Sequence, residues 1–533
     1  MPTSLTYFFG ITIFCVLLPI TTKAQEPHCI ETPQIVTFKP QTIFDNQEQG
    51  FTFIHRWANA IHIDTKIVTL ENEAAFFLNK CVKNVADMAE LERYLRSQKY
   101  LRDAKVISDE VAENITVTTW DNWSLMPTIS FGRKGGETSY SFGVKERNLL
   151  GLGIDVDIST YNNSQREGYR IKSTIPLFKK QNIDLSFRFA DNDDGTQQSL
   201  FLQKHFASFY TNYAYNIGFD EESRNNTTYQ NDTEQAIYAH KLRYKSIEYA
   251  WLSNNDDESL LRFYFGVTQD QHTFSNLTNS ALPLSSSTLP QDRDFIYPWL
   301  QIDYIQKDFK KLTNIHLITQ IEDFNHGWQF SSTLGLSDGN KQNSAWALFK
   351  TKVSKGFEVH YNALILMDLA LEADIYDQQQ RFLFHLNSEY FYNLSEHWGV
   401  YLSNTNVLSK NQYLDNPVTM GASTGLRGFP LQYQHGEHST KFTSEIRYYP
   451  GINLFKLFDL AAAGFFDTGR TFGESVVENI ESTWLHSVGI GIRLYSPHST
   501  GNNQIIHIDF AFPQSENPTV DSFEIRVEAK KSF

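Results

Sequence analysis

The sequence predicts a mainly β protein: a transmembrane antiparallel β-barrel of about sixteen strands, preceded by a small α+β domain. Three observations predict this fold. Beyond residue 127, polar and apolar residues alternate over many segments, such as Ile183 to Phe189, which is the pattern of strands with one polar and one apolar face. Phe, Trp and Tyr make up 14% of the chain. After the N-terminal segment, no stretch approaches the roughly 18 consecutive apolar residues of a spanning helix.

The N-terminal segment predicts export. Tyr7 to Ile20 is an uncharged apolar run that is too short to span a membrane, and small residues precede Gln25. We expect a signal peptide over residues 1–24. Residues 25–58 follow as an extension for which the sequence predicts no structure.

Two cysteines, Cys29 and Cys81, remain after the expected cleavage. In an oxidising compartment they are a candidate disulfide, and the alternative is two free buried thiols. Neither has a histidine at ligand spacing beside it, so we predict no metal site and no cofactor. The net charge of −15 argues against nucleic acid as a partner.

The small domain is predicted over residues 59–119. Expected strands and helices alternate in the order β-α-α-β-β. The segments are a strand at Ile61–Thr65, helices at Glu71–Lys83 and Asp87–Ser97, and strands at Ala104–Ile107 and Asn114–Thr119. Residues 120–533 form the predicted barrel, in which Ile506–Phe512 and Phe523–Ala529 also alternate strictly. About 400 residues at about 25 per strand and connection give about sixteen strands.

Two motifs lie near the C-terminus. The first is the segment from Gly421 to Pro430, with Gly425, Leu426, Arg427, Gly428 and Phe429 at its centre, and the second is Phe465-x-Asp467-x-Gly469. Glycines on both sides of Arg427 permit a tight turn. An arginine inside a barrel requires carboxylate partners, because an unpaired buried charge costs several kcal/mol.

With these motifs, most of residues 59–533 resembles the BamA/TamA superfamily of outer-membrane β-barrels, which includes the two-partner-secretion transporters. The resemblance is carried, in order, by Val144–Gly153, Gly421–Pro430, Gly464–Gly469 and Ser487–Arg493. The small domain resembles a single POTRA module through its element order and through Glu90–Ser97 and Trp120–Pro127. A generic small α+β domain is the alternative. The central assembly protein of the family carries several such modules, whereas this chain has room for one.

The resemblance implies several site residues. The Arg427 loop would fold into the lumen and meet Asp467, by motif, and Glu445, by its place on the preceding strand. The alternative is an ordinary surface loop with an exposed arginine. The last strand would be a targeting signal that the cell's barrel-assembly machinery recognises, with Phe523, Ile525, Val527 and Phe533 as its apolar positions.

The resemblance also implies a function. It predicts a non-enzymatic factor in the outer membrane, with its N-terminal domain in the periplasm, that accepts unfolded polypeptides and passes them into or across the membrane. A weak seam between the first strand, near Ile129–Phe131, and the last would open toward the outer-membrane lipids. The alternatives are a passive pore and a structural or adhesive surface barrel.

Three other motifs give weaker evidence for a functional site. Gly335–Gly339 matches G-x-S-x-G but lies between alternating strands, so we predict no catalytic residue. His435-x-x-His438 has no third ligand and is predicted to be solvated. Paired acids such as Asp256-Asp257 are predicted to be loop charges, with a weak calcium site as the alternative.

Overall fold

The computed structural model describes most of the chain from residue 35 to residue 530. The described residues are 35–41, 62–80, 83–109, 114–177, 182–230, 233–277, 289–337, 345–376, 380–455, 457–475, 479, 481–497 and 505–530. Within them, no helix is long and apolar enough to cross a membrane. The expected signal peptide, both cysteines and Phe533 lie outside these residues.

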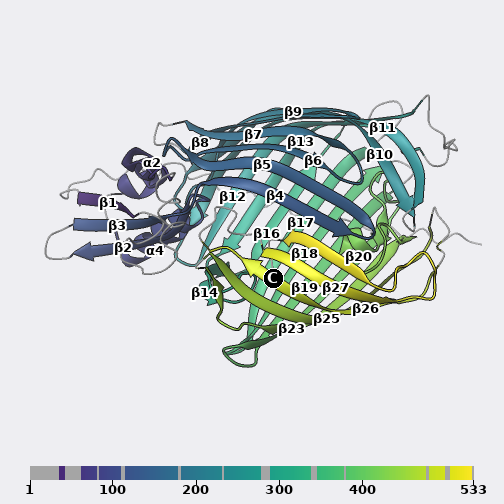
Figure 1. Cartoon of the computed structure of the whole chain (residues 1–533). Helices are drawn as coiled ribbons and strands as arrows, with labels where there is room; N and C mark the ends of the chain where they lie inside the picture. Colours follow the sequence, from purple (N-terminus) through teal and green to yellow (C-terminus); the bar gives the residue numbers. More distant parts are fainter. Residues whose placement is uncertain are drawn as a thin grey trace, which may run out of the picture.

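The small N-terminal domain is a three-stranded sheet covered by helices (Figure 1). The sheet order is β1 (Ile35–Gln41), β3 (Asn114–Asp121), β2 (Leu101–Asp109). β3 pairs in parallel with β1 and antiparallel with β2. The helices are α2 (Ile67–Glu73), α3 (Ala75–Leu78) and α4 (Val85–Arg96). The core they enclose includes Phe38, Leu70, Phe77, Leu91, Leu95, Ile115 and Val117.

The structure differs from the predicted elements of this domain in three places. The strand expected at Ile61–Thr65 is wrong over its described residues, because the Thr65 amide donates to the Asp121 carboxylate at 2.8 Å rather than to a sheet neighbour. The first strand of the sheet is β1 instead, which lies in the stretch without a predicted structure. The single helix predicted from residue 71 is also wrong, since helix α2 begins at residue 67 and a turn at Ala74 separates it from α3. A one-residue turn leaves the apolar spacing nearly unchanged, so the pattern does not reveal it.

A closed antiparallel barrel makes up the rest of the described chain (Figure 1). Its ring holds 20 strands, and the two-residue β24 (Asn453–Leu454) adds only a short hairpin beside β25. The ring strands are β4 (Leu125–Lys134), β5 (Glu137–Leu149), β6 (Ile154–Asn162), β7 (Glu167–Leu177), β8 (Ile183–Asn192), β9 (Gly195–Lys204), β10 (Tyr213–Gln230), β11 (Thr233–Asn255), β12 (Ser259–Asn276), β13 (Arg293–Gln306), β16 (Gln329–Gly335), β17 (Ala345–His360), β18 (Ala363–Tyr376), β19 (Gln380–Asn393), β20 (Trp398–Lys410), β23 (His438–Tyr448), β25 (Phe458–Phe472), β26 (Leu485–Tyr495), β27 (Ile505–Gln514) and β28 (Glu524–Lys530).

The predicted strand number was therefore too low. The assumed length for a strand with its connection was too long, because the chain reverses within two residues at Gly135-Gly136 and at Asp193-Asp194. Short turns of this kind fit more strands into the same length.

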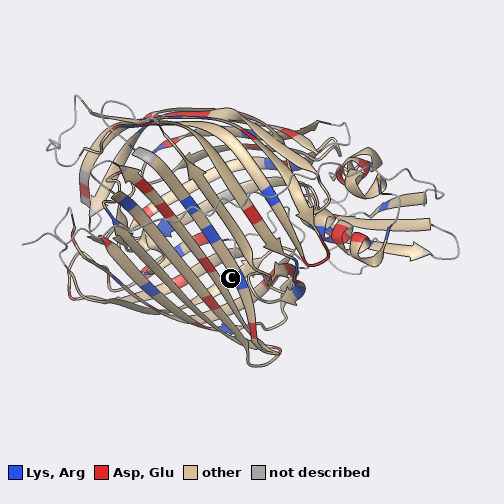
Figure 2. Cartoon of the chain, turned by 180° about the vertical axis from the view of Figure 1, so that it is seen from behind, with Lys and Arg blue, Asp and Glu red and all other residues tan. Residues whose placement is uncertain are grey.

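The two faces of the ring differ in polarity. The outward face carries exposed apolar side chains all around the ring, among them Phe142, Ile247, Phe265, Leu300 and Ile490. Charged residues of both signs are spread over the barrel strands (Figure 2), and many of them form ion pairs inside the ring. An apolar outer face with a charged interior suits a barrel surrounded by lipid.

The small domain docks on the turn between β5 and β6, and we call this end of the ring the domain end. Asn148 is fully buried there, and its amide donates to the Thr65 hydroxyl at 2.8 Å. Its side-chain oxygen accepts from the Gly153 amide at 2.7 Å. The Gly151 carbonyl accepts from the Lys66 amide at 3.0 Å. The motif Val144–Gly153 thus holds the domain against the ring.

A short hairpin closes off part of the domain end. Strands β14 (Phe309–Thr313) and β15 (Ile321–Asn325) form it between β13 and β16, and its tip buries Ile315 and Ile318 against inward-facing residues of the ring. The cluster around Ile318 contains Tyr449, Ala461, Ala463, Tyr495 and Ile505. The hairpin also contacts the small domain, since the Arg96 guanidinium binds both carboxylate oxygens of Asp323 at 2.9 to 3.0 Å.

Candidate functional site: the lumen loop and the barrel seam

The connection between β20 and β23, residues 411–437, folds into the barrel, and we call it the lumen loop. It contains β21 (Val418–Met420), a 3-10 turn at Ala422–Thr424 and β22 (Gln434–Gly436). Leu426 and Phe429 are fully buried.

The glycines around Arg427 have conformations that other residues rarely adopt. Gly425 and Gly428 have φ values of 88° and 87°. A Cβ atom on Gly428 would lie 2.8 Å from the Pro513 side chain. Left-handed backbone and close approach to the wall therefore both require glycine at position 428.

Arg427 makes a buried ion network with the wall. Its Nε and Nη2 atoms donate to the two oxygens of Asp467 at 2.6 and 2.8 Å, and its Nη1 donates to Glu445 at 3.1 Å. The guanidinium also lies over the Phe465 ring, 3.4 Å from the centroid. The structure thus brings together the three residues that the resemblance placed together. A two-pronged contact of this kind fixes orientation as well as charge.

The network is larger than the sequence suggested. Asp509 of β27 lies 3.6 Å from Arg427 and 2.6 Å from Arg493 of β26. Arg447 of β23 donates to Glu445 at 3.1 Å. Asp509 and Arg493 both lie in segments with strict alternation, at positions facing opposite to their apolar neighbours. That alternation was the signal that could have added them to the site.

Glu524 connects the lumen loop to the first barrel hairpin. Its carboxylate is buried and accepts from the amide of Gly428 at 2.9 Å. It also accepts a short hydrogen bond from the amide of Gly135, in the turn between β4 and β5. Glu524 itself begins β28, the last strand. One carboxylate thus bridges the loop, the first hairpin and the last strand.

The junction of β28 with β4 is the weakest in the ring, and we call it the seam. In the described residues its ladder contains one pair, Val527 with Arg133. Every other pair of neighbouring ring strands has at least seven. Backbone pairing supplies much of the cohesion between strands, so the seam is the place where the ring separates at least cost.

The other residues singled out in the sequence take different places. Phe523 directly precedes β28, whereas Ile525 and Val527 lie within it, and Phe523 and Ile525 are exposed on the outer face. Gly469 lies under the lumen loop, where a Cβ atom would be 2.9 Å from the Met420 sulfur. The prediction of a solvated His435 is wrong, because the ring is buried and its Nε2 lies 2.8 Å from the Tyr229 carbonyl oxygen.

The small domain contains a buried acid. Glu73 accepts hydrogen bonds from the hydroxyls of Tyr94 and Tyr100, at 2.7 and 3.1 Å. Burial raises the pKa of its carboxyl from 4.5 to about 7 despite these bonds. Between these pH values the native state binds more protons than the unfolded chain. Stability of the domain is therefore expected to fall by about 3 kcal/mol as the pH rises through this window.

Hydrogen exchange of the α2 amides in the full chain measures this effect. Wild type and Glu73→Gln are compared at each pH, so that the intrinsic pH dependence of exchange cancels. The protection of wild type should decrease between pH 4.5 and 7 relative to the variant. A constant ratio of the two exchange rates would contradict the prediction.

The fold and site together define a closed β-barrel with an inserted, ion-paired loop and a small docked N-terminal domain. No family model matches the sequence, and no curated protein matches it.

Among solved structures, the chain is similar to CdiB from Escherichia coli, with 9% identity, a TM-score of 0.48, and coverage of 93% of this chain and 76% of that one. It is similar to BamA from Haemophilus ducreyi lacking POTRA domains 1–3, with 11% identity, a TM-score of 0.41, and coverage of 94% and 85%. It is also similar to the FrpB iron transporter from Neisseria meningitidis, with 9% identity, a TM-score of 0.41, and coverage of 80% and 87%. At these identities the likeness concerns the barrel fold alone.

Proposed function

We propose that this protein is a non-enzymatic outer-membrane factor that accepts unfolded polypeptides at its small domain and passes them into or across the membrane through the barrel. The observation that carries the proposal is the seam. A barrel needs complete pairing to be stable in lipid, and a junction with a single ladder pair among the described residues, which end at residue 530, is an exception that suits opening. The apolar outer face supports an outer-membrane location.

The small domain supports the receiving role. In its sheet, β1 and β2 are both edge strands, each paired on one side with β3. An edge strand such as β1 can receive an extended polypeptide as a further strand. On β2, the Glu92 side chain of α4 already accepts a hydrogen bond from the Val106 amide at 2.9 Å, so the β1 edge is the better candidate. In this proposal the domain is a single POTRA-like module at the periplasmic end.

A passive pore is less favoured by the contents of the ring. The lumen loop is pinned to the wall by Arg427, and the β14–β15 hairpin packs Ile318 against inward-facing residues at the domain end. Both segments occupy space that a permanently open channel would leave to water.

A reversible lock on the seam tests the proposal. Arg133→Cys and Val527→Cys place thiols on paired residues, in a background with Cys29 and Cys81 replaced by serine. The purified full chain is placed in liposomes, and the insertion of an unfolded outer-membrane protein is followed. We expect acceleration by the reduced form, its loss on oxidation, and its return on reduction.

A second cysteine pair provides the matched control. Phe510→Cys and Ile525→Cys are partners in the β27–β28 ladder, so a disulfide there shares strand β28 but leaves the seam free. Oxidation of this pair should leave the acceleration unchanged. Full activity of the barrel with a locked seam would contradict the proposal.

A further inference from the structure

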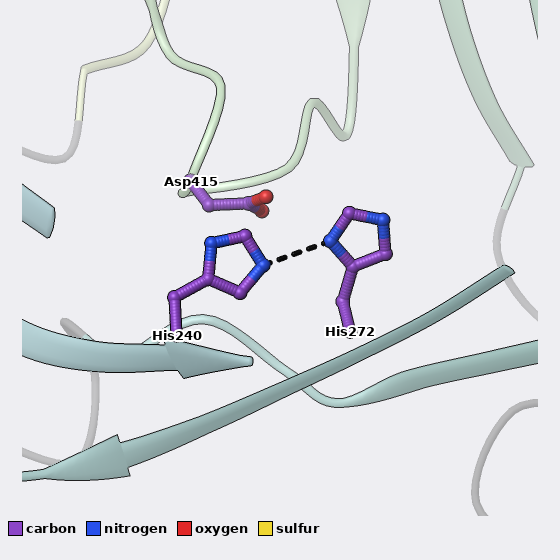
Figure 3. Close-up of side chains that lie close together, drawn as sticks. All are labelled: His240, His272 and Asp415. Carbon is purple, nitrogen blue, oxygen red and sulfur yellow. Dashed lines mark hydrogen bonds between the residues drawn. The ribbon is translucent and has the colours of Figure 1, made fainter. Parts of the chain in front are cut away.

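A second polar cluster lies on the opposite part of the barrel wall, away from the Arg427 network. His240 of β11 and His272 of β12 are diagonal neighbours across the ladder, and the lumen loop brings Asp415 above them (Figure 3). The Nε2 atom of His240 and the Nδ1 atom of His272 face each other at 2.9 Å. One donor atom from each of the three residues lies within 4.8 Å of the other two.

We propose that His240, His272 and Asp415 bind a divalent transition-metal ion at the end of the barrel opposite the small domain. Imidazole nitrogen and carboxylate oxygen together are a donor set for late first-row ions such as Ni²⁺, Cu²⁺ and Zn²⁺. The remaining ring nitrogens and the spacing of the donors support this assignment.

The ring nitrogens that point away from the site are already held by partners. His272 places its Nε2 atom 3.1 Å from a carboxylate oxygen of Asp270. His240 places its Nδ1 atom 3.2 Å from the side-chain amide of Asn226. A carboxylate that accepts from the far nitrogen of a histidine fixes the ring and raises its basicity as a ligand. Both rings are therefore held with one nitrogen toward the other ring, beside Asp415.

Binding of an ion requires small rotations of the two rings and of the Asp415 carboxylate, and a change of tautomer. Without a metal, the short contact between the rings is a hydrogen bond in which one nitrogen keeps a proton. With a metal, that proton moves to Nδ1 of His240, and the amide of Asn226 turns so that its oxygen accepts. His272 keeps its Nε2 proton on Asp270. Both histidines stay neutral throughout, so no proton is gained or lost.

The spacing indicates the kind of ion. Two nitrogens 2.9 Å apart, each bonded to one ion at about 2.1 Å, subtend an angle of about 90°. Right angles belong to square-planar and octahedral sites, which Cu²⁺ and Ni²⁺ prefer with nitrogen and oxygen donors. Tetrahedral Zn²⁺ would require the rings to separate further. Ni²⁺ is therefore chosen as the probe ion, because its preferred angle is close to this spacing.

The two arginines around the site are each paired with a carboxylate, which is compatible with a bound cation. Arg224, which acts on His240 through its charge, donates to Glu222 at 2.9 Å. Arg293 binds both oxygens of Asp415, at 2.8 and 2.9 Å, and neutralises that carboxylate. Each carboxylate oxygen has a second lone pair for the metal. Asp270 adds one further negative charge beside His272. A bound ion would tie the lumen loop to β11 and β12, on the side away from Arg427.

Calorimetric titration with Ni²⁺ tests the proposal. The full chain is purified in detergent with an affinity tag that contains no histidine. We expect one ion per chain for wild type, and loss of this binding in the His240→Gln/His272→Gln double variant. Asp270→Asn keeps all three ligands and should weaken binding about 10- to 100-fold.

Matched variants make the result specific. The described residues contain one other cluster of this kind, His62 with Asp64 and Asp121 in and beside the small domain. His62→Gln should therefore leave Ni²⁺ binding unchanged. Heat-modifiability on gels shows that each variant still forms a barrel. If the folded wild type bound no Ni²⁺, or if binding survived in the double histidine variant, the cluster would be only a hydrogen-bonded pair and the proposal would be overturned.

Discussion

Replacing Arg427 with alanine is expected to lower the stability of the barrel by about 3–5 kcal/mol, because it leaves a fully buried carboxylate without its main partner. The three carboxylates of the barrel wall do not lose the same share of their contacts. Glu445 retains Arg447 at 3.1 Å, and Asp509 retains Arg493 at 2.6 Å. Asp467 receives both of its arginine hydrogen bonds from Arg427.

Unfolding in urea, followed by heat-modifiability, measures the change. The double variant Arg427→Ala/Asp467→Asn should recover part of the loss, with a coupling energy of about 2–3 kcal/mol. Arg427→Lys should be less stable than wild type, since lysine cannot contact both carboxylate oxygens of Asp467 in the same plane. Arg243→Ala, at an exposed arginine of β11 away from the seam, is the control. If Arg427→Ala unfolded like this control, the lumen loop would not depend on the network.

Replacing Glu524 with alanine is expected to loosen the seam. The buried amides of Gly135 and Gly428 lose a charged acceptor, and hydrogen bonds of this type contribute about 1.5–3 kcal/mol. Because these amides lie in the first hairpin and in the lumen loop, both should detach more often from β28. The rate of disulfide formation between Arg133→Cys and Val527→Cys should fall.

The control for this experiment lies on the same strand. Glu528 contacts Arg526 and Lys530 of its own strand, so Glu528→Ala removes a carboxylate from β28 and keeps the hydrogen bonds of Glu524 to Gly135 and Gly428. It should leave the disulfide rate near that of the parent cysteine pair. Equal rates in all three proteins would show that Glu524 does not hold the seam.

Much of the architecture could be predicted from the sequence, because polar and apolar residues alternate along a strand that has one polar and one apolar face. The alternation at Ile506–Phe512 and Phe523–Ala529 coincides with β27 and β28, and Ile183–Phe189 lies within β8. The contact of Arg427 with Asp467 and Glu445 was also expected, because the family resemblance implied it, through the motif for Asp467 and through its place on the preceding strand for Glu445. These features depend on residues that are close in sequence or carried by a recurring pattern.

The features that were missed depend on how distant strands come together. The strand number depends on connection lengths that alternation does not record. Asp509 and Glu524 lie on strands that were recognised, but their partners are set by closure of the ring. Strand β1 contains Pro40 and lies far in sequence from its partner β3, so no local sequence pattern predicted this strand. The pairing of His240 with His272 depends on the register between β11 and β12.

The hairpin at the domain end has a consequence for the order of folding. Ile318 is buried by residues that extend to Ile505, near the end of the chain. A contact between such distant residues forms only after the intervening segments have been placed. The tip of the hairpin therefore stays unburied until β25, β26 and β27 have joined the ring. We therefore expect the ring to assemble with this end open and the burial of Ile318 to be one of the last steps.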